Sequence, residues 1–416
     1  MAMELNTKYG KIKIFAKTLE EDALGQIVTL ANSVLGEGAN LRIMPDAHAG
    51  AGCVIGTTMK ITDKICVNLV GVDIGCGVDL IKTNIDFNSR LEELDDVIRK
   101  YIPYGKRHHE KVKTYRDFSK LKCWDKLKKE TREVATKSLG SLGGGNHFIE
   151  AYDNGYLAVH SGSRNIGWRV AQYYQIQAEK QVSQRMTKLK EQALKTIPEN
   201  LRENWLKENK SKVAIDSDIA YLVEDLMFDY LHDMNIMQEF AIVNRKAMLE
   251  IIVSKMNGRI TDQITSSHNY IDMSYDKTGN KVINRPNAAY DETFLSSREV
   301  ILRKGAISAR KDEMLVIPLN MRDGLLLCEG KGNPDWNYSA PHGAGRLYSR
   351  SKAKQILSLE DYQETMKGIF STCINKDTLD ESPFAYKDFK EIMELIEPTV
   401  KIITRLIPIY NFKASE

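Results

Sequence analysis

The sequence of 416 residues is short of cysteine, proline and net charge, and each shortage excludes a class of protein. Six cysteines without a C-x-x-C pair do not make a disulfide scaffold, which favours a reducing compartment. Ten prolines without a Pro- or Ser-rich run leave no linker, which favours one composite domain. Lys and Arg number 59 against 56 Asp and Glu, a net charge of +3, so any nucleic-acid binding must use a local basic patch.

Long hydrophobic runs are missing as well. The longest ones, such as Ile65–Val72, have the length of a strand and are far shorter than a membrane span. The first residues, Met1–Thr7, have neither the basic nor the apolar region of a signal peptide. We therefore expect a soluble, cytoplasmic protein without membrane attachment.

Strand-like and helix-like patterns alternate in blocks. Apolar residues recur at i, i+3, i+4 and i+7 from about residue 170 to 256, which predicts a helical insertion. Helices are also predicted at Leu359–Ile369 and Tyr386–Leu406. Short β-branched runs cut by glycine predict strands at Lys11–Phe15, Leu41–Met44, Cys53–Thr57, Ile65–Val70, Val78–Thr83 and Leu157–His160. The predicted fold class is α+β: a single composite domain, residues 1–416, of mixed β-sheets with a helical insertion and C-terminal helices.

Eight histidines are present, and five of them lie where chemistry is usually found. These five follow apolar runs in Gly- or Ser-rich turns, at His48, His147, His160, His268 and His342. A single histidine of this kind is more often a buried, hydrogen-bonded residue, but five together favour a functional site. The other three, His108, His109 and His232, are expected on helix surfaces.

A carboxylate and a thiol lie three residues apart in the turn Gly71–Asp79. Asp73 and Cys76, together with histidines, form a mixed O, S and N ligand set for a divalent transition ion. A thiolate has spare lone pairs and can bridge two ions. The alternative is a small buried cysteine in a tight turn. No spacing of a zinc finger occurs, so a structural zinc is not expected.

Phosphate-binding groups are suggested by a glycine run and by several cations. The run Gly140–Gly145 has backbone N–H groups that could cradle phosphate, although such runs are often simple turns. A charge-rich solvated surface is the alternative for the cations, which are Arg164, Arg303, Lys304, Arg310, Arg346, Arg350 and Lys352.

Seven short motifs occur in order along nearly the whole chain. They are Met44–His48, Val72–Gly77, Gly145–Glu150, His160–Arg164, His268–Asn269, Arg303–Ala306 and His342–Arg350. This succession resembles the RtcB family of RNA ligases, and so many ordered motifs are highly specific. The resemblance implies an RtcB-like fold and a GTP- and Mn²⁺-dependent ligase that joins RNA 2′,3′-cyclic phosphate or 3′-phosphate ends to 5′-hydroxyl ends. Its implied intermediates are histidine–GMP and an RNA 3′ end carrying GMP, and its products include GMP and pyrophosphate.

The resemblance also implies the site residues. Asp73, Cys76 and His147 would bind one metal ion, and Cys76, His160 and His268 a second. His342 would be the nucleophile that takes GMP, and Asp46 would orient its imidazole. The implied guanylate site comprises Asn146, His147, Phe148, Ile149, Glu150, His268, Asn269, Pro318, Leu319, Asn320, Met321, Leu325, His342, Gly343, Ala344, Gly345, Tyr386 and Lys413.

One loop departs from the pattern of the family. Where the family usually has Pro-Gly-Ser-Met-Gly, this chain has Pro318–Gly324 with an Arg322–Asp323 pair, and Leu325 replaces an expected serine. Two small residues have become larger ones, so the choice of nucleotide or of RNA end is expected to differ. One hypothesis is that Arg322 or Asn320 takes over contacts with the nucleotide; the alternative is an ion pair that faces solvent.

Two other functions remain alternatives. One is a two-metal phosphoesterase or cyclic phosphodiesterase on RNA ends, and the other is an RNA-binding protein with a degenerate site. A hydrolase has no need of His342 as nucleotide acceptor, and a binding protein has no need of the metal ligands. Ligand affinity alone favours zinc over manganese, so Mn²⁺ use would depend on supply and geometry, with Zn²⁺ or Co²⁺ as substitutes in vitro. We expect a monomer that acts on RNA and GTP, with an activating protein partner left open.

Overall fold

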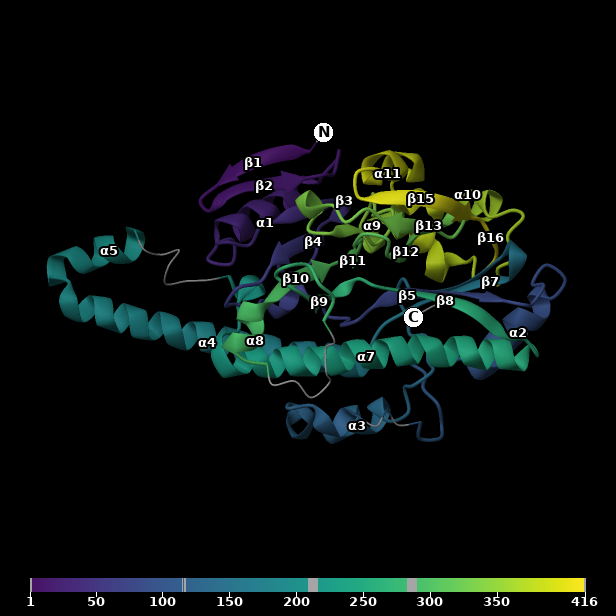
Figure 1. The fold of residues 1–416 in the computed structure, drawn as a ribbon, viewed down its shortest axis with the longest axis horizontal. Helices are drawn as coiled ribbons and strands as arrows, with labels where there is room; N and C mark the ends of the chain where they lie inside the picture. Colours follow the sequence, from purple (N-terminus) through teal and green to yellow (C-terminus); the bar gives the residue numbers. More distant parts are fainter. Residues whose placement is uncertain (1, 114, 116, 209–215, 283–289, 415–416) are drawn as a thin grey trace.

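Four strands near the N-terminus and two from the second half of the chain build the largest sheet among the described residues. A computed structural model describes residues 2–113, 115, 117–208, 216–282 and 290–414. Figure 1 shows this sheet at the N-terminal end of the molecule. In spatial order its strands are β1 (Met3–Thr7), β2 (Gly10–Ile14), β3 (Arg42–His48), β4 (Ile55–Lys60), β10 (Arg298–Lys304) and β9 (Asn269–Asp276).

A second, five-stranded sheet positions the candidate metal ligands Asp73, Cys76, His147, His160 and His268, which we call the metal-type cluster. Its order is β16 (Pro408–Lys413), β6 (Phe148–Tyr152), β7 (Tyr156–Ser161), β5 (Gly77–Thr83) and β8 (Ile260–Ser267), and all its pairs are antiparallel. Two smaller sheets complete the body. They pair β11 (Ala306–Ser308) with β14 (Ser339–Pro341), and β13 (Gly324–Gly330) with both β12 (Met314–Asn320) and β15 (Val400–Leu406).

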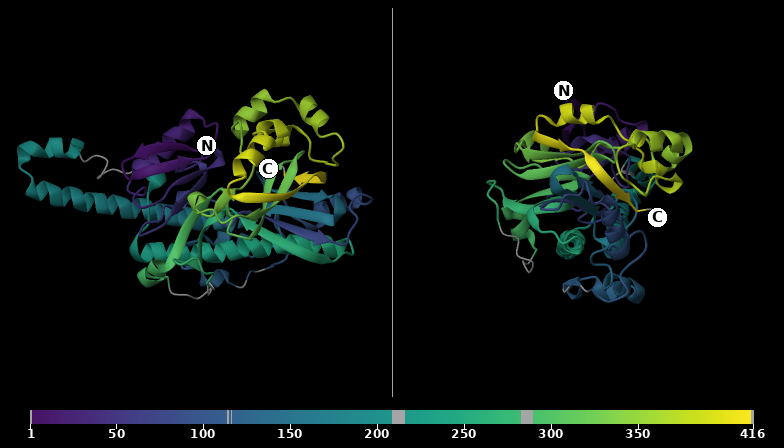
Figure 2. Two further views of the ribbon diagram at one scale, coloured as in Figure 1. Left: turned by 45° about the horizontal axis from the view of Figure 1, so that its top comes forward. Right: turned by 90° about the vertical axis from the view of Figure 1, so that its right-hand side faces the viewer.

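Two long helices carry the predicted insertion. α7 (Glu224–Lys255) runs along the whole body, and its apolar residues are buried on several sides because sheets, α4 and α2 all pack on it. α4 (Arg164–Thr196) is buried only in its first half; beyond Val182 it projects from the body with α5 (Arg202–Glu208), as Figures 1 and 2 show. The other helices are α1 (Glu21–Asn32), α2 (Leu91–Tyr101), α3 (Lys129–Ala135), α8 (Glu292–Ser297), α9 (Arg350–Ile356), α10 (Leu359–Thr365) and α11 (Phe389–Ile396).

The α+β class is confirmed, and two predicted elements are wrong. Ile65–Val70 is not a strand but contains a short 3₁₀ turn, because the amides of Leu69 and Val70 bond to carbonyls three residues back. The helix predicted over Tyr386–Leu406 ends at Ile396, and Val400–Leu406 pairs with β13 instead. His108 and His109 lie in a loop rather than on a helix. The extent of the single domain stays a prediction.

The structure also bears on membrane attachment. Among the residues that the structure describes, no helix is both long enough and apolar enough to span a bilayer.

Candidate active site

The turn before β5 places Asp73 and Cys76 side by side. The amide of Cys76 donates to the Asp73 carbonyl at 3.2 Å, which closes the turn. Gly75 has φ of +70°, and a Cβ there would lie 2.7 Å from Cα of Gln238 on α7. Glycine is therefore required where the turn presses against the helix.

Adjacent strands of the five-stranded sheet bring the histidines to this turn. His160, near the end of β7, is opposite both Val78 of β5 and Phe148 of β6. His147 directly precedes Phe148. His268 directly follows β8, whose Ser267 is opposite Gly77. The side chains of Cys76, His147, His160 and His268, which come from separate segments, thus meet at one end of the sheet.

The donor atoms of this metal-type cluster face one another. Sγ of Cys76 lies 3.5 Å from Nε2 of His147 and 3.2 Å from Nε2 of His160. Nε2 of His147 is 3.1 Å from Oδ2 of Asp73, and Nε2 of His160 is 3.4 Å from Nε2 of His268. The described ligand atoms of Cys76, His147 and His160 all lie within 4.8 Å of one another.

Hydrogen bonds fix the tautomers that a metal ion needs. Nδ1 of His147 donates to the Leu142 carbonyl at 2.8 Å, and Nδ1 of His160 donates to the Asn146 carbonyl at 3.2 Å. Each ring then directs the lone pair of Nε2 into the cluster. The lone pairs on Nε2 of His147 and His160 then face each other and Cys76 with no hydrogen between them. A cation bound there would remove the repulsion between them.

The electrostatics of the cluster agree with a cation site. Burial raises the pKa of the Cys76 thiol, and the Asp73 carboxylate raises it further. Burial also lowers the pKa of His160 and His268, which keeps both rings neutral. A bound cation would favour the thiolate and neutral imidazoles, the forms that act as ligands. The residues present therefore fit a metal ion.

A second pair, His342 and Asp46, adjoins this cluster. His342 follows β14, and Asp46 lies on β3 with no exposed surface. Nδ1 of His342 is 2.7 Å from Oδ2 of Asp46, and neither has a hydrogen-bond partner among the described residues. The two atoms are in close contact, but their geometry is not that of an aligned hydrogen bond. The centre of the His342 ring also lies 4.9 Å from that of His268, at a tilt of 57°, which joins the pair to the metal-type cluster.

A cavity of about 300 Å³ opens over His342. Its volume is at the lower end of the range of small-molecule sites. His48 lies at its wall, where burial lowers its pKa to about 4 and leaves the ring neutral. The cavity is lined by His48, Ile55, Asn146, Phe148, Glu150, His160, Pro318, Leu319, Asn320, Gly324, His342, Gly343, Ala344, Gly345, Arg346, Arg350, Tyr386 and Lys413.

One buried carboxylate organises the cations of this cavity. Glu381 is 2% exposed, and its oxygens lie 2.8 Å from Nζ of Lys413, 3.2 Å from Arg346 and 3.3 Å from Arg350. The hydroxyl of Tyr386 donates to it at 2.7 Å. Burial alone would raise the pKa of Glu381, but the three cations outweigh burial and lower it to about 2. Glu381 is thus an anion that holds three cations and an aromatic ring at one wall.

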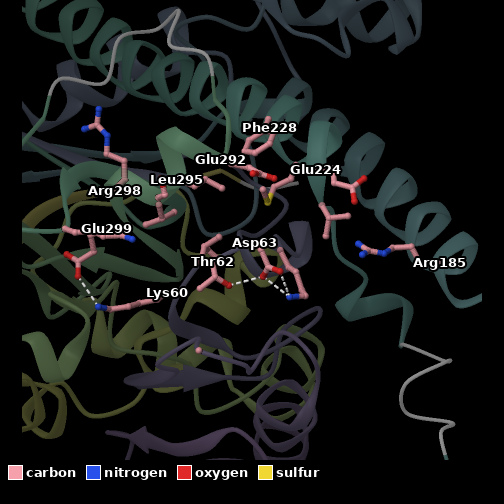
Figure 3. A pocket seen from close by; sticks show the side chains of 18 residues that line it. Lys60, Thr62, Asp63, Arg185, Glu224, Phe228, Glu292, Leu295, Arg298 and Glu299 are labelled. Atoms are coloured by element: carbon pink, nitrogen blue, oxygen red, sulfur yellow. Dashed lines mark hydrogen bonds and ion pairs between the residues drawn. The ribbon is translucent and has the colours of Figure 1, made fainter. Parts of the chain in front are cut away.

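A larger cavity, of about 720 Å³, lies elsewhere, between α4, α7, α8 and the loop after β4. Figure 3 shows Lys60 paired with Glu299 there, and Arg185 and Arg298 at opposite ends. Lys64 pairs with Asp63 at 2.7 Å. Four of the charged residues of this cavity form these two pairs, and none of its described lining residues is a histidine.

The chain matches the family model described as tRNA-splicing ligase RtcB over residues 26–123 and 117–414. It belongs to the RtcB family. An RNA-splicing ligase RtcB of Escherichia coli K12 is 29% identical over 97% of both chains. A tRNA-splicing ligase RtcB of Aeropyrum pernix is 24% identical over 88% of this chain and 86% of that protein. RNA-splicing ligase RtcB homolog 1 of Entamoeba histolytica is 26% identical over 89% of this chain and 80% of that protein. As an RtcB family member, the chain is an enzyme of the RNA ligase class.

Twelve of the residues expected at the guanylate site of an RtcB protein line the smaller cavity, and the others lie outside it. Ile149 and Leu325 are fully buried within sheets. Met321 packs in a small core and accepts from the hydroxyl of Tyr362. Asn269 donates to the Asp73 carbonyl at 3.2 Å and accepts from the Gly305 amide at 2.9 Å, so it braces the metal-type turn. His147 and His268 belong to the metal-type cluster.

Two of the expected phosphate-binding cations have other roles. Arg303 is fully buried and pairs with Asp272 at 2.8 Å. Lys304 is buried and donates to the Cys53 carbonyl at 2.9 Å. Both side chains therefore join parts of the fold. Arg346 and Arg350 are the cations that do line the nucleotide-sized cavity.

Glu381 and Lys387 are the site residues that sequence reasoning missed. Nζ of Lys387 donates to the carbonyls of Pro45 and Ala47, and so it holds the strand that carries Asp46. Both residues lie in the stretch Asp380–Asp388, which has no histidine or glycine run to mark it. The sequence holds no signal for Glu381, because only the fold shows that Arg346, Arg350 and Lys413 cluster around one buried carboxylate.

Proposed function

We propose that this RNA ligase activates itself with GTP through His342. The observation that carries the proposal is the 2.7 Å contact of His342 with Asp46 at the floor of a cavity. A carboxylate at Nδ1 holds the proton there, so Nε2 keeps its lone pair. Nε2 would attack the α-phosphorus of GTP; the N–P bond forms, the bond to the bridging oxygen breaks, and pyrophosphate leaves.

The walls of the cavity supply recognition of a guanine nucleotide. Glu150 is 2% exposed, and the hydroxyl of Tyr152 donates to it at 2.6 Å. Burial raises its pKa to about 7. Its carboxylate can accept the adjacent N–H donors that guanine presents and adenine does not. Tyr386 offers an aromatic face, and Lys413, Arg346 and Arg350 supply positive charge.

The donors of the metal-type cluster would suit Mn²⁺, with five residues that would hold two ions. Asp73, Cys76 and His147 would hold one ion, and Cys76, His160 and His268 the other. Such a pair supplies positive charge that neutralises phosphate oxygens and stabilises a leaving group. The backbone carbonyls of Leu142 and Asn146 orient the rings of His147 and His160, respectively.

The later steps act on RNA ends. A 2′,3′-cyclic phosphate would first be hydrolysed to a 3′-phosphate. The 3′-phosphate oxygen would then attack the phosphorus of His342-bound GMP and free the imidazole. The 5′-hydroxyl of the second RNA end would attack the 3′-phosphorus, forming the new phosphodiester and releasing GMP. The six free, buried cysteines suit the reducing cytoplasm. We propose that the monomer acts there.

The test is incubation with α-labelled GTP and Mn²⁺, followed by denaturation. We expect an acid-labile label on the protein, absent in His342→Ala, with metal content unchanged because His342 is outside the proposed ligand set. Undiminished labelling of His342→Ala would remove this residue from the mechanism. Conversion of a cyclic phosphate end without any GMP uptake would favour the two-metal phosphodiesterase.

A further inference from the structure

One segment carries a charge opposite to that of the rest of the chain. Residues 99–137 contain 14 Lys and Arg against five Asp and Glu, a net charge of +9. The whole chain has +3, so the remaining residues have −6. The segment runs from the end of α2 through α3, and Figure 1 shows α3 on the side of α7 that faces away from the sheets. The structure therefore has a local basic surface that its overall charge conceals.

The part of this segment nearest the sheets is residues 103–113, which we call the basic strip. Its backbone is bonded to residues 136–143, the stretch that leads to the metal-type cluster. Amide-to-carbonyl bonds join Gly105 to Gly143 at 2.8 Å, His109 to Lys137 at 3.0 Å and Lys113 to Thr136 at 2.8 Å. The strip is thus fixed in place before any ligand binds.

The strip is connected to a metal-type histidine through one residue. The amide of Leu142 donates to the Pro103 carbonyl at 2.8 Å, and the carbonyl of Leu142 accepts from Nδ1 of His147 at 2.8 Å. Arg164 also donates to the Gly105 carbonyl at 3.2 Å. The basic strip therefore begins directly beside the loop that positions His147.

The cations of the strip face solvent. Lys106, Arg107, Lys111 and Lys113 are all exposed, and none forms an ion pair with a residue in the described part of the chain. Glu110 is the single acid among them. The guanidinium of Arg107 stacks on the Tyr104 ring at 3.6 Å, which steadies it without neutralising its charge.

We propose that the basic strip binds the sugar-phosphate backbone of an RNA strand whose end reaches the metal-type cluster. Unpaired exposed cations along an ordered loop bind a polyanion by releasing its counterions, whatever its sequence. The inference rests on the proposed function, since it assigns a surface to the RNA of that reaction. The net charge of −6 on the residues outside 99–137 makes this basic segment the place where charge favours RNA.

The test compares two variants that each lose four positive charges. The strip variant is Lys106→Ala, Arg107→Ala, Lys111→Ala, Lys113→Ala. The control is Lys180→Ala, Lys188→Ala, Lys190→Ala, Lys195→Ala on α4, where the lysines are equally exposed and unpaired in the described structure. Binding of a fluorescent single-stranded RNA with a 3′-phosphate is measured by anisotropy over a series of salt concentrations.

We expect the strip variant to bind this RNA at least about tenfold more weakly, and its salt slope to fall by ~0.7 for each phosphate that the variant no longer neutralises. The RNA affinity of the control variant should stay within about twofold of the wild-type affinity, because its lysines lie outside the proposed RNA surface. Replacing the three strip lysines by arginine should retain affinity. Labelling with GTP needs no RNA, so it reports correct folding of each variant.

Equal RNA affinity of the strip variant and wild type would overturn the inference. So would unchanged RNA binding with lost binding to phosphatidylserine vesicles, which would assign the strip to a membrane surface. The outcome is separable from the proposed function: a wild type that binds RNA through the strip but never takes up GMP supports the strip and contradicts only the guanylylation.

Discussion

The two cavities of this protein differ in size and in the arrangement of their charges. The larger, of about 720 Å³, has five cations and four acids in its lining, and several of them pair with each other. The smaller, of about 300 Å³, has three cations and one acid in its lining, with three histidines. Paired charges stabilise a surface, whereas like charges held together by a buried anion leave a field for a ligand. The histidines and the unbalanced charge of its lining, rather than its volume, therefore identify the smaller cavity as the candidate site.

The positions of the two cavities in the fold also differ. The smaller cavity lies where strands of separate sheets end, so residues from β3, β6, β12 and β16 converge on it. The larger one lies among helices α4, α7 and α8 and two strands of the six-stranded sheet, β4 and β10. Strand ends fix side-chain positions closely, which the proposed transfer of GMP between three partners requires.

The largest effect is expected from removal of the Cys76 thiol, which we propose as a ligand of both ions. Cys76→Ser should lower Mn²⁺ affinity at both ions by about 100-fold or more, since changes outside the direct ligands already cost about 10–100-fold. His160→Ala should affect mainly one ion. Calorimetric titration with Mn²⁺ measures both. The control Cys328→Ser alters a buried cysteine in a separate core and should bind as wild type does. Two ions at wild-type affinity in Cys76→Ser would contradict the bridge.

The next effect tests whether Glu381 organises the smaller cavity. Glu381→Gln leaves three cations without their anion, so we expect a loss of about 3–5 kcal/mol of unfolding free energy. The GTP concentration for half-maximal labelling should also rise. The matched change in the larger cavity is Glu299→Gln, which breaks pairs with Lys60 and Arg310. It should lower stability but leave GTP labelling unchanged. A rise of the GTP requirement in both variants would remove the distinction between the cavities.

Much of the metal-type cluster could be predicted from sequence. A turn motif with Asp73 and Cys76, and histidines placed at strand ends, indicate both the residue types and their location. Most of the strands were predictable as well, since β-branched runs bounded by glycine are typical of strands. Ile65–Val70 and Val400–Leu406 were mistaken because a short apolar run fits helix, turn or strand until its neighbours are known.

The role of Glu381 could not be predicted, because it depends on distances between segments. Its partners Arg346 and Lys413 are 35 and 32 residues away and belong to different elements. The same holds for the burial of Arg303, whose partner Asp272 lies across β9 and β10. A charge in a sequence does not show whether it is paired, and that pairing decides its function.

A smaller effect concerns pH and Glu150. Burial raises its pKa to about 7 from the usual 4.5, so folding favours the protonated form. Its contribution to stability is therefore present below about pH 4.5 and is lost as the pH rises through 7, by roughly 1–3 kcal/mol. Recognition of guanine needs the ionised form, so GTP affinity should rise over the same range. Glu150→Gln should remove both dependences, in chemical denaturation and in labelling. A pH-independent wild type would show that Glu150 is ionised throughout.

The smallest effect is expected at the loop that departs from the family pattern. Arg322 donates to Asp323 at 2.9 and 3.0 Å and to Thr365 at 2.8 Å, and it does not line the smaller cavity. Its side chain is 37% exposed, so the pair contributes at most about 1 kcal/mol to stability. Arg322→Ala should therefore change the GTP requirement of labelling by less than about twofold, the scale of a weak surface pair.

Asn320 provides the contrast within the same loop. It lines the cavity, and its Oδ1 accepts from the amides of Arg322 and Asp323 at 3.0 and 2.9 Å. Asn320→Ala removes this clamp beside the nucleotide, so it should raise the GTP requirement more than Arg322→Ala does, by an amount corresponding to about 0.5–1.5 kcal/mol. Titration of labelling with GTP in both variants decides the point. A tenfold loss in Arg322→Ala alone would mean that this side chain leaves Asp323 and reaches the phosphates, because a fixed Arg322–Asp323 pair has no path to the ligand.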